Sequence, residues 1–387
     1  MIKDTKEFIT ESKIINILQR LSRIDSTQPE GNEKEVVKEI LDIFKDYDID
    51  YKMIDHGKNR ASLVITLEGK DNDNSIAFLG HIDTVPVEDY EKWIYPPFDG
   101  VIEQGYMYGR GTADMKGGVT SMILTLLYLL ENNITPSNKI KFCFTADEEA
   151  NGIGILAVKE NKILDDTKAI FVAEPSNEKI GLAEKGALWL EVNVEGLSAH
   201  GSRPELGVNA IEYLFEYIEK FKCRVKNDET NELLGKTTIS INKFNGGIGT
   251  NVIPTEAKAN IDIRTIPGHS HDEIIDMAKT IAQDMMDDKS NLNIIIDVEN
   301  NRPAIETKRN QRFIKDIEQT FKQLKYDFDY KGIYFYTDAS QVIPDIKVPF
   351  VILGPGDDKM AHQRDEKIKL SSISNITEIY INYILGI

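Results

Sequence analysis

Phe78-Leu79-Gly80-His81-Ile82-Asp83 places an imidazole and a carboxylate directly after an apolar, strand-like run. Two later apolar runs end in a similar way, one shortly before the pair Glu148-Glu149 and one before Glu174. The carboxyl ends of parallel strands meet at one edge of a sheet, where open α/β sheets bind their ligands. We therefore expect these side chains to gather at one site.

The order of strand-like and helix-like runs predicts the fold class. The strand-like runs are 62–67, 76–79, 140–144, 169–172 and 348–353, and the helix-like runs are 10–51, 119–131, 153–160 and 311–324. Their alternation favours an α/β architecture, in which helices flank a mainly parallel central sheet. The polar residues 70–74 also predict a hairpin-like pairing of the first two strands.

The pattern changes after Glu174, where a second unit is expected. Its strand-like runs are 187–194, 237–244 and 257–263, and its amphipathic run is 209–221. A chain of 387 residues exceeds the usual size of a single core. We predict a discontinuous catalytic domain, residues 1–182 and 299–387, interrupted by an α+β lid at 183–298.

Composition excludes several classes of partner. The formal net charge of −18 argues against nucleic acid and against anionic membrane surfaces, because both attract an excess of Lys and Arg. The apolar stretch 122–130 is too short to cross a bilayer. Cys143 and Cys223 lie far apart, and residues 1–13 lack an apolar signal core, so we expect a cytoplasmic protein.

The residue types at the expected site indicate a metal centre. Imidazole and carboxylate ligands suit zinc and similar divalent ions, and two histidines with three carboxylates would serve two ions if one carboxylate bridges them. Adjacent carboxylates such as Glu148-Glu149 are costly unless a cation offsets one, which leaves the other free as a base. Taken singly, His81 also fits a core histidine, and the glycine-rich loop around Asp114 also fits a plain turn.

Together these motifs resemble the two-zinc aminoacylase and carboxypeptidase family that includes acetylornithine deacetylase and succinyl-diaminopimelate desuccinylase. The matching motifs occur in the family's order and span nearly the whole chain. They are Gly80–Pro86, Gly109–Gly118, Asp147–Glu149, Ala173–Pro175 and Ala361–Glu366.

The resemblance implies a ligand set for two divalent ions. Zinc is the first expectation, and cobalt or manganese are the alternatives. His81 and Glu174 would bind one ion, Glu149 and His362 would bind the other, and Asp114 would bridge them.

The resemblance also implies catalytic roles. Asp83 would orient the ring of His81 from behind. Glu148 would be the general base. His200, in the lid, would help to bind the substrate carbonyl, commonly across the interface of a homodimer that forms through the lid domain.

A further set of residues would bind the substrate. Arg264 suits a substrate carboxylate, because its planar guanidinium can donate two parallel hydrogen bonds. The resemblance places Asn251, Thr337 and Gly354 at the substrate as well.

The expected reaction is hydrolysis of an amide bond in a small, carboxylate-bearing substrate. Glu174, rather than Asp, and the segments 336–339 and 361–363 are similar to acetylornithine deacetylase-like members, so an N-acyl amino acid deacylase is the first hypothesis. A dipeptidase or carboxypeptidase acting on short peptides is the alternative. A non-catalytic metal-binding interaction protein is disfavoured, because Glu148 and Asp83 are both present.

Overall fold

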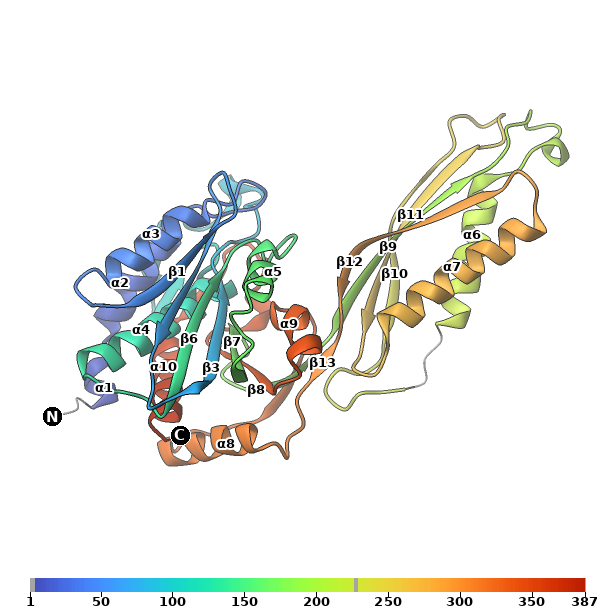
Figure 1. Ribbon diagram of the computed structural model, residues 1–387. Coiled ribbons are helices and arrows are strands. Elements are labelled where there is room, and N and C mark those ends of the chain that lie inside the picture. Colours follow the sequence, from blue (N-terminus) through green and yellow to red (C-terminus); the bar gives the residue numbers. More distant parts are fainter. Residues whose placement is uncertain (1–3, 226–228, 387) are drawn as a thin grey trace. The chain divides into compact units, whose positions relative to one another are not determined.

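A computed structural model describes residues 4–225 and 229–386 (Figure 1). The chain divides into two compact units. The first unit comprises Met1–Ala183, Glu306–Gly332 and Thr337–Ile387, and the second unit comprises Glu184–Ile305 and Ile333–Tyr336. Strand β12 (Asn293–Arg302) runs through the boundary expected after residue 298, so the second unit extends further than the sequence pattern indicated.

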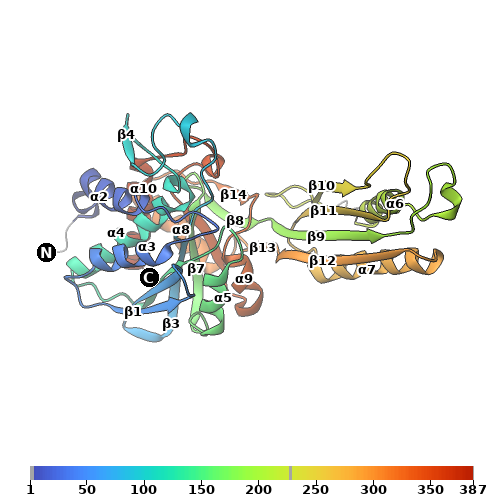
Figure 2. The same cartoon turned by 90° about the horizontal axis from the view of Figure 1, so that it is seen from above.

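The central sheet of the first unit follows the order β1-β2-β6-β3-β7-β15-β8-β13, and β14 pairs with β8. Figure 2 labels β1, β3, β7, β8, β13 and β14 of this sheet. Its strands are β1 (Asp50–Asp55), β2 (Ala61–Leu67), β3 (Asp71–His81), β6 (Asn138–Thr145), β7 (Thr167–Pro175), β8 (Ile180–Glu184), β13 (Ile305–Glu306), β14 (Tyr330–Ile333) and β15 (Phe350–Gly354). Strands β6, β3, β7 and β15 are parallel neighbours. The expected α/β class with a mainly parallel sheet is therefore confirmed.

The predicted hairpin between the strands at 62–67 and 76–79 is wrong. Strand β6 lies between them, antiparallel to β2 and parallel to β3. A parallel pair needs a long crossover connection, and the segment from β3 to β6 supplies it through helix α4 (Gly117–Glu131). The hairpin partner of β2 is β1, which begins inside the stretch read as helical, and the polar turn at 70–74 instead opens β3.

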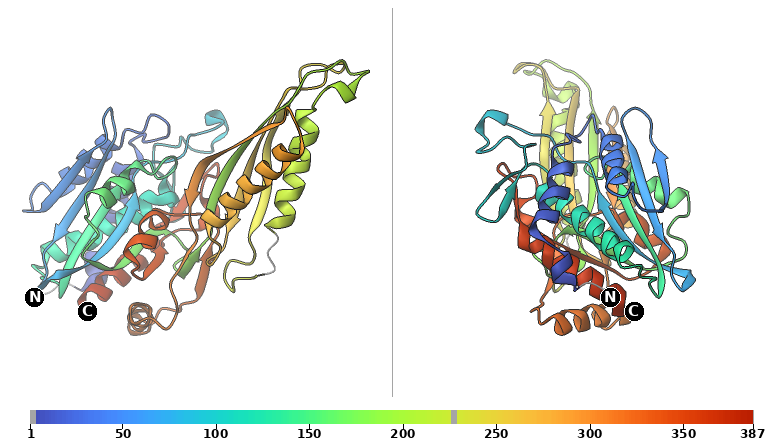
Figure 3. Two further views of the ribbon diagram at one scale, coloured as in Figure 1. Left: turned by 45° about the vertical axis from the view of Figure 1, so that its right-hand side comes forward. Right: turned by 90° about the vertical axis from the view of Figure 1, so that its left-hand side faces the viewer.

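Helices flank this sheet (Figure 3). They are α1 (Thr5–Phe8), α2 (Glu11–Ser22), α3 (Glu33–Ile43), α4, α5 (Ile153–Glu160), α8 (Arg312–Leu324), α9 (Ala339–Ile346) and α10 (Leu370–Gly386). Helix α4 packs against α10 and strand β7. The stretch Thr112–Glu131 has the length and hydropathy of a membrane span, yet 94% of its apolar window is buried in the protein. Its apolar side chains are thus explained by core packing.

Stacked aromatic rings fill the core beneath the sheet. The rings of Phe78 and Phe171 are stacked with centroids 4.7 Å apart, and Phe142 and Tyr380 pack against Phe78. These rings come from adjacent parallel strands and from α10. They fix the strands whose carboxyl ends carry the candidate site.

The second unit is an antiparallel sheet covered on one face by two helices. Its elements are β9 (Gly186–Glu195), η3 (Pro204–Leu206), α6 (Ala210–Arg224), β10 (Thr238–Gly246), β11 (Glu256–Thr265), α7 (His271–Asp288) and β12, with the strand order β10-β11-β9-β12. Leu188, Leu190, Val192 and Val194 alternate along β9 and face the helices in a common core.

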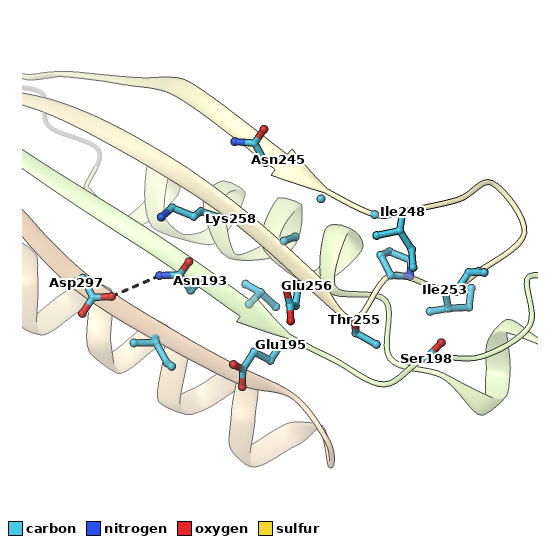
Figure 4. A pocket seen from close by; sticks show the side chains of 17 residues that line it. Asn193, Glu195, Ser198, Asn245, Ile248, Ile253, Thr255, Glu256, Lys258 and Asp297 are labelled. Atoms are coloured by element: carbon cyan, nitrogen blue, oxygen red, sulfur yellow. Dashed lines mark hydrogen bonds between the residues drawn. The ribbon is translucent and has the colours of Figure 1, made fainter.

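The opposite face of this sheet is partly exposed and carries both polar and apolar side chains. A cavity of about 690 Å³ lies there. Figure 4 shows the side chains that line it, among them Asn193, Lys258 and Asp297. Its lining includes none of the predicted site residues. We therefore place no chemistry in it.

Candidate metal centre

His81 is the last residue of β3 and lies buried among carboxylates. Its Nε2 is 3.1 Å from Asp114 Oδ1 and 3.5 Å from Glu174 Oε1. Its Nδ1 lies 3.0 Å from the backbone oxygen of Asp83 and 3.6 Å from Oδ1 of the same residue. The ring is thus held from behind by Asp83, while Nε2 faces the acidic side chains.

Asp114 lies in a loop that is held in place by hydrogen bonds to the buried carboxylate of Glu366. Glu366 Oε1 accepts the backbone N–H groups of Ala113 and Asp114, and its Oε2 accepts the N–H of Gly111 and Nη1 of Arg110. Gly111 has a φ of +79°, which suits a residue without a Cβ. One carboxylate therefore sets the loop conformation that presents Asp114.

The pair Glu148-Glu149 follows β6 in a turn fixed by Asp83. The Asp83 carboxylate accepts the backbone N–H of Glu148 at 3.1 Å and that of Glu149 at 3.2 Å. Glu149 Oε2 lies 3.0 Å from His362 Nε2. Asp83 thus positions His81 and the glutamate pair at the same time.

His362 reaches the centre from a loop between η4 (Asp358–Met360) and β16 (Lys367–Lys369). Its Nε2 is also 3.5 Å from Asp114 Oδ2. Two groups of side chains could each hold a metal ion: His81 with Glu148 and Glu174, and His81 with Asp114 and Glu149. Within each group, one possible ligand atom from every residue lies within 4.8 Å of the others. The structure therefore brings the five expected ligands and Glu148 together in the first unit.

The electrostatics of the cluster fit divalent cations. Burial raises the pKa of Glu149 and of Glu174, and the charge of Asp114 raises each pKa further. Burial alone would lower the pKa of His81, but Glu174 and Asp114 raise it well above its usual value. The hydrogen bond to Glu149 raises the pKa of His362 to about 9.

These shifts share one cause, an excess of negative charge taken out of water. Among the residues that the structure describes, Glu149 Oε1 and Glu174 Oε2 are buried and have no hydrogen-bond partner. Bound cations would satisfy both oxygens and offset the charge. The donor set of imidazole nitrogens and carboxylate oxygens suits zinc.

The other predicted residues lie elsewhere. His200, Asn251 and Arg264 belong to the second unit. His200 is exposed, with Nδ1 2.8 Å from Ser202 Oγ. Arg264 donates to Asp262 on its own strand at 2.9 Å.

Thr337 and Gly354 belong to the first unit, where both are buried. The Thr337 hydroxyl accepts the N–H of Ala339. A Cβ at Gly354 would lie 2.2 Å from the oxygen of Ala173. Close packing of β15 against β7 therefore explains the glycine at this position.

Sequence reasoning missed a network that supports the centre. Arg60 donates to Gln28, Glu33 and Asp147, and Gln28 donates to Asp83 at 2.7 Å. Arg60 thereby ties together the two aspartates that hold His81 and the glutamate turn. Gln28 and Arg60 come from loops and Glu33 begins α3, so no strand-end pattern marks them. Asp147 does follow β6 and belongs to a recognised motif, but the motif does not reveal its contact with Arg60.

Comparison with known proteins identifies the family of the chain. The model of peptidase family M20/M25/M40 matches residues 77–386. A probable succinyl-diaminopimelate desuccinylase of Staphylococcus aureus (strain N315) is 31% identical over 397 residues, covering 95% of this chain and 94% of the relative.

Solved structures share the fold. Aminopeptidase PepT from Bacillus cereus superposes with a TM-score of 0.78 at 23% identity, covering 97% of this chain and 98% of that one. A dinuclear metal-binding peptidase of the M20 family from Bacillus subtilis superposes with a TM-score of 0.73 at 16% identity, covering 98% of each chain.

The fold and the gathered ligands are those of a metal-dependent amidohydrolase. The chain belongs to peptidase family M20/M25/M40, and the resemblance recognised in its motifs is confirmed.

We expect Arg60→Met to lower zinc affinity about 10–100-fold, the usual cost of removing a partner that orients metal ligands. Arg60 is mostly buried, so Gln28→Leu provides a second variant that breaks only the link to Asp83. Zinc affinity is measured by competition with a chelator. The exposed Arg23→Met is the control, and affinities equal to the control in both variants would contradict the positioning role.

Proposed function

We propose that the protein hydrolyses the amide bond of N-acyl amino acids and uses two divalent ions, zinc in the first place. The observation that carries this proposal is the position of Asp114. Its Oδ1 faces His81 and its Oδ2 faces His362, at 3.1 and 3.5 Å. One carboxylate whose two oxygens face two different histidines is suited to bridge two ions.

The remaining ligands divide around this bridge. His81 and Glu174 lie on one side, and Glu149 and His362 lie on the other. The dinuclear peptidase from Bacillus subtilis, which shares the fold, supports two ions rather than one.

The proposed chemistry follows from the position of Glu148. Two bound divalent ions would supply Lewis acidity that lowers the pKa of a water molecule and polarises the scissile carbonyl. Glu148 is buried beside the ligands, and its backbone is fixed by Asp83. It would take a proton from the attacking water and return it to the leaving amine, while His200 would stabilise the oxyanion.

The substrate class rests on the relatives. The Staphylococcus aureus relative is named for removal of a succinyl group from an amino acid, which supports a deacylase with Arg264 as partner of a substrate carboxylate. The structural neighbours are named as peptidases, so a dipeptidase or carboxypeptidase is the second candidate.

We expect the zinc-loaded protein to release amine from N-succinyl or N-acetyl amino acids faster than from dipeptides. Turnover should stop when a chelator removes the metal and return when zinc, cobalt or manganese is added. Amine release is measured across one panel of substrates. A clear preference for dipeptides would replace the deacylase with a peptidase.

We expect Glu148→Gln to lower kcat at least about 100-fold, because a general base contributes roughly that much, while metal content stays near that of the wild type. Glu149→Gln is the matched neighbour and should instead lower the metal content. Metal per chain is measured by atomic spectroscopy beside kcat. Near-full activity of Glu148→Gln would rule out its role as the base.

A homodimer through the second unit is part of the proposal. Strand β10 is an edge strand of its sheet. Phe215 on α6 is 56% exposed although it stacks on Phe244 of β10, and Ile248 is 94% exposed. An unpaired edge beside exposed apolar side chains favours pairing with a second copy.

We expect mixed dimers of His200→Ala and Glu148→Gln chains to regain up to about a quarter of wild-type activity if His200 acts across the interface, because one of the two sites is intact in each of the mixed dimers, which form about half of the population. Activity is measured after the variants are unfolded and refolded together. Refolding each variant alone is the control. No gain on mixing would place His200 at its own chain's site.

A further inference from the structure

The backbone N–H of His81 donates to a sulfur atom instead of to a neighbouring strand. Strand β3 pairs with β6 as far as His81 and Thr145, and the N–H of Ile82 donates to the Thr145 oxygen at 2.9 Å. Successive N–H groups of a strand point to opposite sides, so the N–H of His81 points away from β6. Pairing of β3 with β7 on that side ends at Leu79 and Val172. The two strands thus stop pairing just before the candidate metal centre.

The thioether of Met115 accepts this N–H. The His81 nitrogen lies 3.2 Å from Met115 Sδ, and both residues are buried, with 1% of their surface exposed. A thioether is a weak acceptor, yet a buried N–H without any partner is costly. Met115 therefore satisfies a backbone group that the end of the pairing between β3 and β7 would otherwise leave unpaired.

A glycine leaves room for this contact. A Cβ at Gly80 would lie 3.2 Å from Cε of Met115 and 2.9 Å from Sδ of Met122, so a side chain at position 80 would press against both methionines. Met122 comes from helix α4 and packs against Gly80. Two thioethers therefore lie beside the same glycine, and Met115 is the one that receives the His81 N–H.

Met115 also belongs to the segment that presents Asp114. It directly follows Asp114, whose backbone N–H is held by Glu366 Oε1 at 3.0 Å. The sulfur contact thus connects the segment Thr112–Lys116 to the end of β3. Across this connection, His81 Nε2 lies 3.1 Å from Asp114 Oδ1. A shift of either backbone would change the distance between these two candidate ligands.

We propose that Met115 is a positioning residue, whose sulfur sets the spacing of His81 and Asp114 for the ion that they share. Its effect falls on one of the two ions, because His81 lies at one oxygen of Asp114 and His362 at the other. This inference rests on the proposed two-ion centre, because it assigns the contact that keeps two of its ligands in place.

The test compares Met115→Leu with Met122→Leu. Both changes replace a buried methionine beside Gly80 by a side chain of similar volume, and only the first removes the acceptor of the His81 N–H. The two zinc dissociation constants are measured by competition with a chelator, and the Tm of each zinc-free protein records any loss of packing. The constant that His81→Ala changes most identifies the ion bound by His81. Met115→Leu should raise that constant about tenfold, and Met122→Leu should change neither.

Norleucine isolates the sulfur atom. It replaces only the sulfur of methionine by a methylene group, and its incorporation throughout the chain affects all nine methionines. Norleucine should raise the same dissociation constant about tenfold in the wild type and cause no further rise in Met115→Leu. Selenomethionine, which keeps an acceptor atom at this position, should preserve the wild-type affinity. An equal rise with norleucine in the wild type and in Met115→Leu would trace the effect to other methionines and overturn the role of this sulfur.

The His81 amide itself separates this inference from the proposed metal centre. Its hydrogen exchange in the zinc-free protein should be faster in Met115→Leu than in Met122→Leu. Equal zinc dissociation constants in the two leucine variants, or an equal rise of both constants in Met115→Leu, would overturn the positioning role. If the wild type binds no zinc, the proposed centre fails, and the exchange of the His81 N–H alone decides whether Met115 holds the end of β3.

Discussion

The structure of the first unit depends on one electrostatic constraint, the burial of several carboxylates around His81. Asp83, Asp114, Glu149 and Glu174 lie together in a place that water hardly reaches. Taking ionised groups out of water is costly, so each must receive hydrogen bonds, a cation or a proton. Among the described residues, Glu149 Oε1 and Glu174 Oε2 receive no hydrogen bond, and burial raises the pKa of both groups.

The scaffold meets the constraint in two layers. The carboxylates that do not face the centre are satisfied by backbone N–H groups and by buried cationic or amide side chains, as with Asp83 and Glu366. Their hydrogen bonds fix the turn of Glu148-Glu149 and the loop of Asp114. Glu149 and Glu174, which face inwards, each keep one carboxylate oxygen without a hydrogen-bond partner among the described residues. The geometry of the candidate ligands is therefore set by hydrogen bonds to residues behind them, such as Asp83 and Glu366.

The sequence predicts the candidate metal ligands better than the residues that hold those ligands in position. His81, Glu149 and Glu174 follow apolar strands, and the parallel pairing of β6, β3 and β7 carries them to one edge. The neighbours of a strand in a sheet depend on residues far away in the sequence. The pattern around β2 therefore did not reveal that β6, rather than β3, lies beside it. Arg60 and Gln28 could not be found from the pattern, because their role arises from contacts over long sequence separations. His362 depended on the family motif for the same reason.

The candidate metal ligands follow strand ends, whereas residues that could select the substrate lie on loops. The ligands at the ends of β3, β6 and β7 are held by the sheet and by the hydrogen bonds of Asp83. Glu88, Trp93 and Arg364 line a cavity beside His362 and lie on loops that can be altered without moving a strand. Relatives of this fold are named both as a desuccinylase and as peptidases, which is expected when one centre is combined with different loops. Substrate choice in this fold is therefore expected to depend on loop residues rather than on the metal ligands.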